Sequence, residues 1–297
     1  MNSQHVVEKD GKKLWTELLG ERGHPPVLLI AGAGAHAHFW SDPFCEALVQ
    51  EGFCVIRFDH RDVGLSSDYE EPYELKDLAE DLITILNDYN FSAAHLVGHS
   101  MGGYIAQLAA AYHPDRVLST TLISCGPVGE RPELKETYSR DEQMVLYETW
   151  QAMLGNKPTS DFEESLPGFM GVWERLNGKV PVDTEMARNY TEELYTRSKH
   201  EVGVHTPHVS VMDNVARTLG EKADIFSQIK CPVLIIHGEE DYLVGIKRGG
   251  EALANALPKS KYEPVADMGH MLFNRNLQDK LVSLIIHFLH ANFPKEE

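Results

Sequence analysis

The sequence is poor in cysteine and in basic residues, and it contains no long apolar run. Four cysteines occur among its 297 residues, and they form no CxxC pair or other ligand spacing, which argues against a zinc site. The 27 Lys and Arg residues are outnumbered by 45 Asp and Glu residues, which gives a formal net charge of −18. An acidic protein repels phosphate backbones, so nucleic acid is not an expected partner.

Signals for a membrane or for secretion are also missing. No stretch is apolar for long enough to span a bilayer, and residues 1–10 are polar, unlike the apolar core of a signal peptide. We therefore expect a reduced, cytoplasmic protein without membrane association. We expect it to be a monomer or a small homo-oligomer.

Apolar, strand-like runs alternate with helical patterns along much of the chain. Strands are predicted at residues 14–19, 27–31, 54–59, 94–97, 118–124, 233–237 and 261–265. Helices are predicted at residues 44–51, 75–89, 103–112, 249–257 and 277–293. Continuous apolar strands separated by helices indicate an α/β fold, in which a parallel sheet is covered on both faces.

Residues 126–226 interrupt this alternation. They contain helical stretches at 141–153 and 184–196, many aromatic residues and no convincing buried strand. We predict a helical cap inserted over the carboxyl edge of a core made of residues 1–125 and 227–297, because ligands of open α/β sheets bind at that edge. The alternative is an elaborate outer layer of the core domain.

The most informative motif is Gly-His-Ser-Met-Gly-Gly at residues 98–103. It follows the predicted strand at 94–97 and precedes the predicted helix at 103–112, so Ser100 occupies a sharp turn between them. Gly-x-Ser-x-Gly in this context is typical of a nucleophile elbow, where small residues let strand and helix approach closely. The helix N-terminus also favours negative charge beside the serine. We predict that Ser100 is the nucleophile.

A serine nucleophile needs a base to take its proton and an acid to orient that base. Asp241 follows the predicted strand at 233–237 in the pattern Gly-x-x-Asp-x-x-Val and is the predicted acid, with Glu239 and Glu240 as rivals. His270 lies in an Asp-Met-Gly-His loop after the last predicted strand and is the predicted base. Activity should rise with pH as His270 loses its proton.

The oxyanion of a tetrahedral intermediate needs preorganised donors. We predict the backbone N–H of Met101, directly after the nucleophile, as one donor. The second is expected in the Ala-Gly-Ala-Gly loop that begins at residue 31, at the N–H of Ala33, with Gly32 and Gly34 as alternatives. A phosphate-binding loop is disfavoured because no Lys-Ser or Lys-Thr follows.

Together these motifs resemble the α/β-hydrolase superfamily, which implies a mostly parallel eight-stranded sheet flanked by helices. Residues 59–66, Asp-His-Arg-Asp-Val-Gly-Leu-Ser, and the Ala-Gly-Ala-Gly loop are similar to the aclacinomycin methylesterase-like group. That resemblance implies hydrolysis of a small-molecule carboxylic ester, including methyl esters, through an acyl-enzyme intermediate. It implies no metal and no organic cofactor.

Other reactions remain open on the same three residues. Lactonases, thioesterases, carbon–carbon bond hydrolases and perhydrolases share this set, and a hydrolase fold can also become a small-molecule receptor. Dehalogenases and epoxide hydrolases of this fold use an aspartate nucleophile, which the serine at position 100 disfavours. Aromatic side chains are expected to line an apolar pocket; they are Trp40, with Phe39 as its alternative, Trp150, Phe169 and Trp173.

Overall fold

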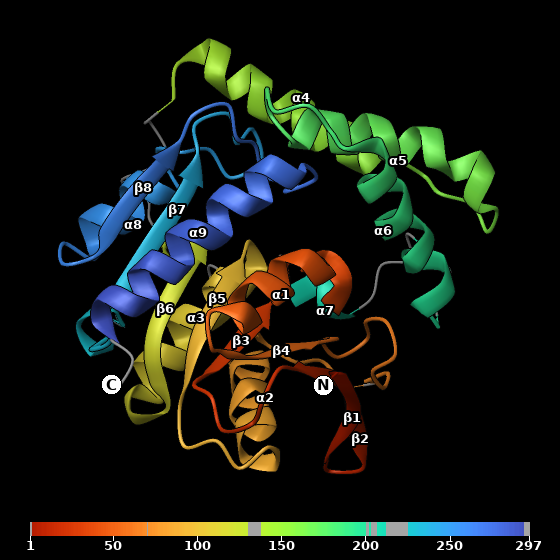
Figure 1. The fold of residues 1–297 in the computed structure, drawn as a ribbon. Coiled ribbons are helices and arrows are strands. Elements are labelled where there is room, and N and C mark those ends of the chain that lie inside the picture. The colour runs from red at the N-terminus through yellow and green to blue at the C-terminus, as the bar shows by residue number, and fades with distance from the viewer. Residues whose placement is uncertain are drawn as a thin grey trace.

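An eight-stranded sheet forms the centre of the molecule, with strand order β1-β2-β4-β3-β5-β6-β7-β8 (Figure 1). The computed structural model describes residues 2–69, 71–129, 138–199, 202, 207–211 and 225–293. The strands are β1 (Asn2–Lys9), β2 (Lys12–Leu19), β3 (Pro26–Ile30), β4 (Cys54–Phe58), β5 (Ala94–His99), β6 (Val117–Ile123), β7 (Val233–Gly238) and β8 (Lys261–Val265). β2 is antiparallel to β1 and β4, and the other pairs are parallel. The expected α/β architecture with a mostly parallel sheet is confirmed.

The first strand was not among the predicted runs. β1 forms a hairpin with β2 at the edge of the sheet, and most of its described side chains are exposed. An edge strand that faces solvent needs no apolar run, so its sequence is polar. The turn residues Asp10 and Gly11, both with positive φ, were the available hairpin signal.

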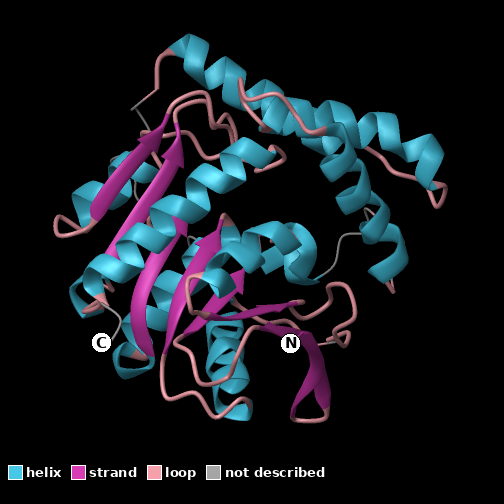
Figure 2. Cartoon of the chain, in the orientation of Figure 1, coloured by secondary structure: helices cyan, strands magenta, loops and turns pink. Residues whose placement is uncertain are grey.

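Helices cover both faces of the sheet (Figure 2). The helices of the sheet region are α1 (Asp42–Gln50), α2 (Leu75–Asp88), α3 (Met101–Tyr112), α8 (Gly250–Ala256) and α9 (Arg275–Asn292). The shorter helical elements are η1 (Ala37–Phe39), η2 (Pro114–Arg116), α7 (Pro207–Ser210) and η5 (Phe226–Gln228). One buried apolar cluster lies under α2, α3 and α8, and a second lies under α1 and α9.

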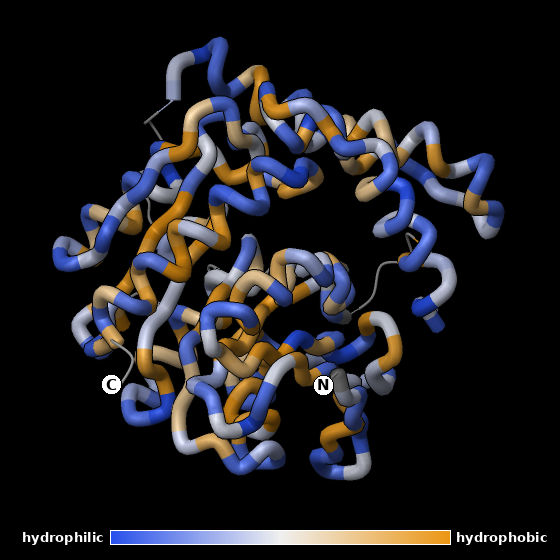
Figure 3. Tube along the Cα trace, viewed as in Figure 1, coloured by the Kyte–Doolittle hydropathy of each residue, from blue (hydrophilic) through white to orange (hydrophobic). Residues whose placement is uncertain are grey.

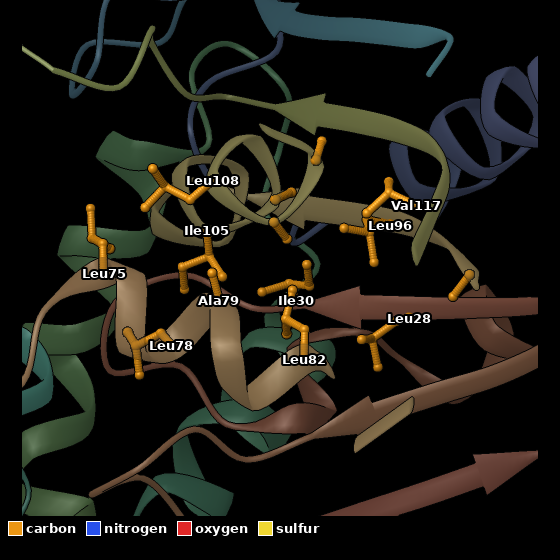
Figure 4. Close-up of a cluster of buried hydrophobic side chains, with 14 of the residues drawn as sticks. Leu28, Ile30, Leu75, Leu78, Ala79, Leu82, Leu96, Ile105, Leu108 and Val117 are labelled. Atoms are coloured by element: carbon orange, nitrogen blue, oxygen red, sulfur yellow. The ribbon is translucent and has the colours of Figure 1, made fainter. Parts of the chain in front are cut away.

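Burial of apolar side chains holds these layers together. Residues with hydrophobic colouring concentrate along the central strands (Figure 3). In the first cluster, Leu28 and Ile30 of β3 face Leu78 and Leu82 of α2 and Ile105 of α3 (Figure 4). Each fully buried side chain of this size contributes about 1.5–3 kcal/mol relative to an exposed one.

Three further helices, α4 (Arg140–Gly155), α5 (Phe162–Leu176) and α6 (Thr184–Arg197), lie beyond the carboxyl ends of the strands (Figure 1). The helices predicted at 141–153 and 184–196 are present as α4 and α6. α5 was missed because Pro167 lies inside it, and proline in a helical pattern normally indicates a break. The division of the chain into a core and a cap over residues 126–226 stays a prediction, and parts of that segment lie outside the described residues.

Candidate active site

Ser100 occupies a sharp turn between β5 and α3. Its backbone has φ 53° and ψ −120°, a conformation that is costly for a residue with a Cβ. A Cβ on Gly98 would lie 2.3 Å from the carbonyl oxygen of Gly102, and one on Gly102 would lie 2.2 Å from that of Ile30. Glycine at both positions is therefore what permits the turn, and the turn presents the serine hydroxyl at the carboxyl edge of the sheet.

His270 links Ser100 to Asp241 by two short contacts. Its Nε2 lies 3.0 Å from Ser100 Oγ, and its Nδ1 lies 2.9 Å from Asp241 Oδ2. The three residues follow β5, β7 and β8, so the shared edge of a parallel sheet brings together positions that are 170 and 29 residues apart. The structure thus brings together the three predicted catalytic residues.

The loop that carries His270 is held from two sides. The His270 backbone N–H donates to the carbonyl of Leu176 at 2.6 Å, and its own carbonyl lies 2.7 Å from Nε2 of His99. Leu176 ends α5, so this helix contacts the His270 loop directly. These contacts limit the freedom of the imidazole, as catalytic geometry requires.

Asp241 is ionised in this environment. Its side chain is fully buried, and burial alone would raise its pKa. The charge of His270 and its hydrogen bond oppose that effect, as do the contacts of His237 and of the backbone N–H of Val244, and the pKa of Asp241 is held well below its usual range. Oδ1 accepts hydrogen bonds from the N–H groups of Leu243 and Val244 at 2.9 and 3.0 Å, which fixes the carboxylate.

The rival carboxylates lie elsewhere. Glu240 pairs with Lys179 and accepts from the hydroxyl of Tyr242, and Glu239 is exposed. Asp241 is the member of this acidic run that contacts His270. The spacing from the glycine that ends β7 was therefore the useful signal.

The loop after β3 lies directly over Ser100. A Cβ on Gly32 would come 3.2 Å from Ser100 Cβ. The turn closes with the Ala35 N–H donating to the Gly32 carbonyl at 3.2 Å, and Gly34 has φ 68°. Ala33 is exposed at the tip of this turn. Met101, at the start of α3, is fully buried. The assignment of Ala33 and Met101 as oxyanion donors stays a prediction.

The carboxylate of Asp59 holds the end of this loop by a hydrogen bond. Its Oδ1 accepts from the backbone N–H of Ala37 at 2.8 Å, and its Oδ2 accepts from the N–H of Leu65 at 2.8 Å. Arg197, on α6, donates to the same Oδ2 at 2.8 Å. The Asp59 side chain is fully buried, so the guanidinium supplies the countercharge that a buried carboxylate needs. One buried ion pair therefore joins α6 to Asp59, and Asp59 in turn holds the backbone at Ala37, where the loop after β3 ends.

The four predicted pocket aromatics occupy different places. Trp40 is 1% exposed and packs on Phe44, whereas Trp150 is 48% exposed on α4. Phe169 and Trp173, on α5, stack with ring centroids 5.7 Å apart. The structure brings these last two together. Their roles in substrate binding stay predictions.

Further rings connect this pair to the loop that carries His270. Trp173 contacts Phe273 edge-on at 5.3 Å, and Phe273 contacts Phe39 at 6.5 Å. Phe39 lies 4.6 Å from the ring of His99, which lies 4.9 Å from that of His270. Sequence reasoning missed Phe273; it follows His270 by three residues, and that proximity was the available signal.

Within the described parts of the chain, no group of three or more His, Cys, Asp and Glu residues could hold a metal ion. Among the helices that the structure describes, none is long and apolar enough to cross a membrane.

Residues 25–276 match the family model described as alpha/beta hydrolase fold. This chain belongs to the α/β hydrolase fold family. Rhodomycin D methylesterase DauP of Streptomyces sp. (strain C5) is 32% identical to this α/β hydrolase over 279 residues, which cover 90% of this chain and 92% of that protein. Rhodomycin D methylesterase DnrP of Streptomyces peucetius is 32% identical over 283 residues, with the same coverage of 90% and 92%. The expected resemblance to methylesterases is confirmed.

Solved structures agree on the fold. Esterase RhEst1 from Rhodococcus sp. ECU1013 superposes on this α/β hydrolase with a TM-score of 0.74 at 18% identity, covering 98% of each chain. Epoxide Hydrolase A from Mycobacterium thermoresistibile superposes with a TM-score of 0.69 at 22% identity, covering 98% of this chain and 99% of that one. One fold therefore accompanies different reactions, and the chemistry must be argued from the site.

Proposed function

We propose that this α/β hydrolase cleaves carboxylic esters, including methyl esters, through an acyl-enzyme formed on Ser100. The observation that carries the proposal is the continuous link from Ser100 Oγ through His270 to Asp241, at 3.0 and 2.9 Å. A hydroxyl, an imidazole and a buried carboxylate in this order form the arrangement that activates a serine. The similarity to two methylesterases supports a carboxylesterase-like hydrolase.

In the proposed reaction, Ser100 Oγ attacks the ester carbonyl while His270 Nε2 takes its proton. Asp241 accepts the Nδ1–H of His270, which selects the tautomer with a free Nε2 and stabilises the imidazolium. The backbone N–H groups of Met101 and Ala33 would stabilise the oxyanion. His270 then protonates the leaving alcohol. In the second half, it deprotonates a water that hydrolyses the acyl-enzyme and releases the acid.

We propose further that residues 126–226 act as a cap that sets substrate choice. Support comes from the position of α4, α5 and α6 beyond the carboxyl ends of the strands (Figure 1) and from the Leu176 carbonyl, which bonds to the His270 loop. The stacked rings of Phe169 and Trp173 favour an apolar or aromatic group on the substrate.

The test is hydrolysis of a p-nitrophenyl ester series from acetate to decanoate, together with methyl esters of aromatic carboxylic acids. The wild type is compared with Ser100→Ala. We expect the variant to lose at least about 10³-fold in kcat/KM. Ser124→Ala is the matched control, because Ser124, like Ser100, has a positive φ and directly follows a strand, here the neighbouring β6.

Ser100→Ala turnover at the wild-type rate would refute the nucleophile. Loss in both serine variants would point to a general fold defect instead. A folded wild type that turns over none of these esters would contradict the proposal and favour the receptor alternative.

A further inference from the structure

A second buried histidine, His237, lies beside the catalytic carboxylate. It is the residue before the glycine that ends β7, and it is 0% exposed. The start of α8 holds its ring in place: a Cβ on Gly249 would lie 2.1 Å from His237 Cε1, and a Cβ on Gly250 would lie 2.6 Å from His237 Cβ. The ring orientation is therefore set by the adjoining backbone.

One hydrogen bond decides where the proton of this ring resides. The backbone N–H of Gly250 donates to Nδ1 of His237 at 3.1 Å, so Nδ1 presents its lone pair. Burial lowers the pKa of His237 to about 4, so the ring is neutral at neutral pH. A neutral imidazole whose Nδ1 accepts a hydrogen bond carries its proton on Nε2.

That Nε2–H lies against the catalytic acid. His237 Nε2 is 3.4 Å from Asp241 Oδ2, and both side chains are fully buried. The same oxygen accepts the Nδ1–H of His270 at 2.9 Å. Among the described residues, His237 Nε2 has no hydrogen-bond partner of good geometry. Its contact with Asp241 is therefore that of a fixed N–H dipole beside an anion, where water does not screen it.

Four other titratable groups that interact electrostatically with Asp241 are uncharged at neutral pH. Burial lowers the pKa of His99 to about 3. It raises the pKa of Tyr104, Cys125 and Tyr138 above their ordinary values. None of these four groups places a charge beside Asp241 at neutral pH, whereas His237 Nε2 lies 3.4 Å from Asp241 Oδ2.

We infer that His237 is a positioning residue that tunes the catalytic base through Asp241. The inference rests on the proposed function for its catalytic meaning. The positive end of the Nε2–H dipole offsets part of the negative charge on Oδ2. Asp241 then stabilises an imidazolium less strongly, so the ring of His270 stays neutral to lower pH. His237 thereby extends the active pH range toward acid.

The tautomer gives a test in the wild-type protein. Long-range ¹H–¹⁵N NMR of the histidine rings should show the proton of His237 on Nε2 at neutral pH. A proton on Nδ1 would place a lone pair against Asp241 and would overturn the inference. This measurement needs neither a variant nor activity.

Two variants of His237 with amide side chains distinguish an electrostatic effect on His270 from a role in packing alone. In His237→Asn, the amide oxygen replaces Nδ1 and keeps the Gly250 contact, but no donor reaches Asp241. In His237→Gln, the amide nitrogen replaces Nε2 and keeps the donor, but the Gly250 contact is lost. We expect the His270 ring to titrate at higher pH in the Asn variant by about half a pH unit, and near the wild-type value in the Gln variant.

The acid limb of kcat/KM should move in the same way as the His270 titration. A wild-type midpoint in the Asn variant, or equal shifts in both variants, would overturn the inference. Ser100→Ala keeps this outcome separate from the proposed function: ester turnover that survives Ser100→Ala refutes the proposed function, whereas the NMR titration tests His237 in either case.

Discussion

Buried neutral histidines predict a steep loss of stability below pH 6.5. Burial lowers the pKa of six histidines from 6.5: to about 4 for His36, His60, His95 and His237, to about 3 for His99, and well below 6.5 for His208. The unfolded chain regains ordinary pKa values and binds more protons than the folded one in this range. The contribution of these histidines to the free energy of unfolding is therefore fully present above about pH 6.5 and is lost as the pH falls toward 4.

The size of the effect follows from proton counting. At pH 5.5 an unfolded histidine is about nine-tenths protonated, whereas one with a pKa near 4 is almost unprotonated. Each histidine then changes the free energy of unfolding by about 1 kcal/mol per pH unit, and the six together by several kcal/mol per pH unit. Because a typical domain is stable by about 5–15 kcal/mol, we expect acid unfolding between about pH 5 and pH 6.

Urea unfolding followed by tryptophan fluorescence at pH 7, 6 and 5.5 measures this dependence. His95→Gln is the informative variant, because His95 bonds to Ser119 at 2.8 Å near the amino end of β5, whereas Ser100 follows its carboxyl end. In this variant the unfolding free energy should change less per pH unit than in the wild type, because one of the six histidines no longer takes up a proton on unfolding. An unfolding free energy that is the same at pH 7 and pH 5.5 would refute the reasoning.

Two further predictions concern the contacts of α5 and α6. Arg197→Met should lower the free energy of unfolding by about 3–5 kcal/mol, because it leaves the Asp59 carboxylate buried without its cation. Adding Asp59→Asn should recover much of that loss in urea titrations, and no recovery would contradict the ion-pair explanation. Trp173→Ala should raise KM for the preferred ester about tenfold, equivalent to about 1.4 kcal/mol. The Trp173 ring contacts Phe273, which lies three residues after His270, so its loss should remove apolar contact with the substrate. Trp150→Ala, at a 48% exposed position, should change KM less than twofold; equal effects would contradict this placement of the pocket.

Local patterns sufficed for much of the fold and for the three catalytic candidates. The strands from β3 to β7 are almost entirely buried and mainly apolar, which a sequence shows directly. Ser100, Asp241 and His270 each follow a recognisable strand, and their neighbouring glycines indicate tight turns. β1 and α5 escaped because an exposed edge strand can be polar and because Pro167 within a helix resembles a helix end.

The sequence by itself determined the succession of strands and helices along the chain and the side chains available at the end of each strand. Periodicity and turn residues, on which these depend, are local properties. Only the tertiary structure decided which distant groups meet. Arg197 and Asp59 are 138 residues apart, and no periodicity connects them. His237 carries the same side chain as fourteen other histidines of this chain. Its neutrality, its tautomer and its contact with Asp241 depend on burial and on the Gly250 N–H, which exist only once the chain has folded.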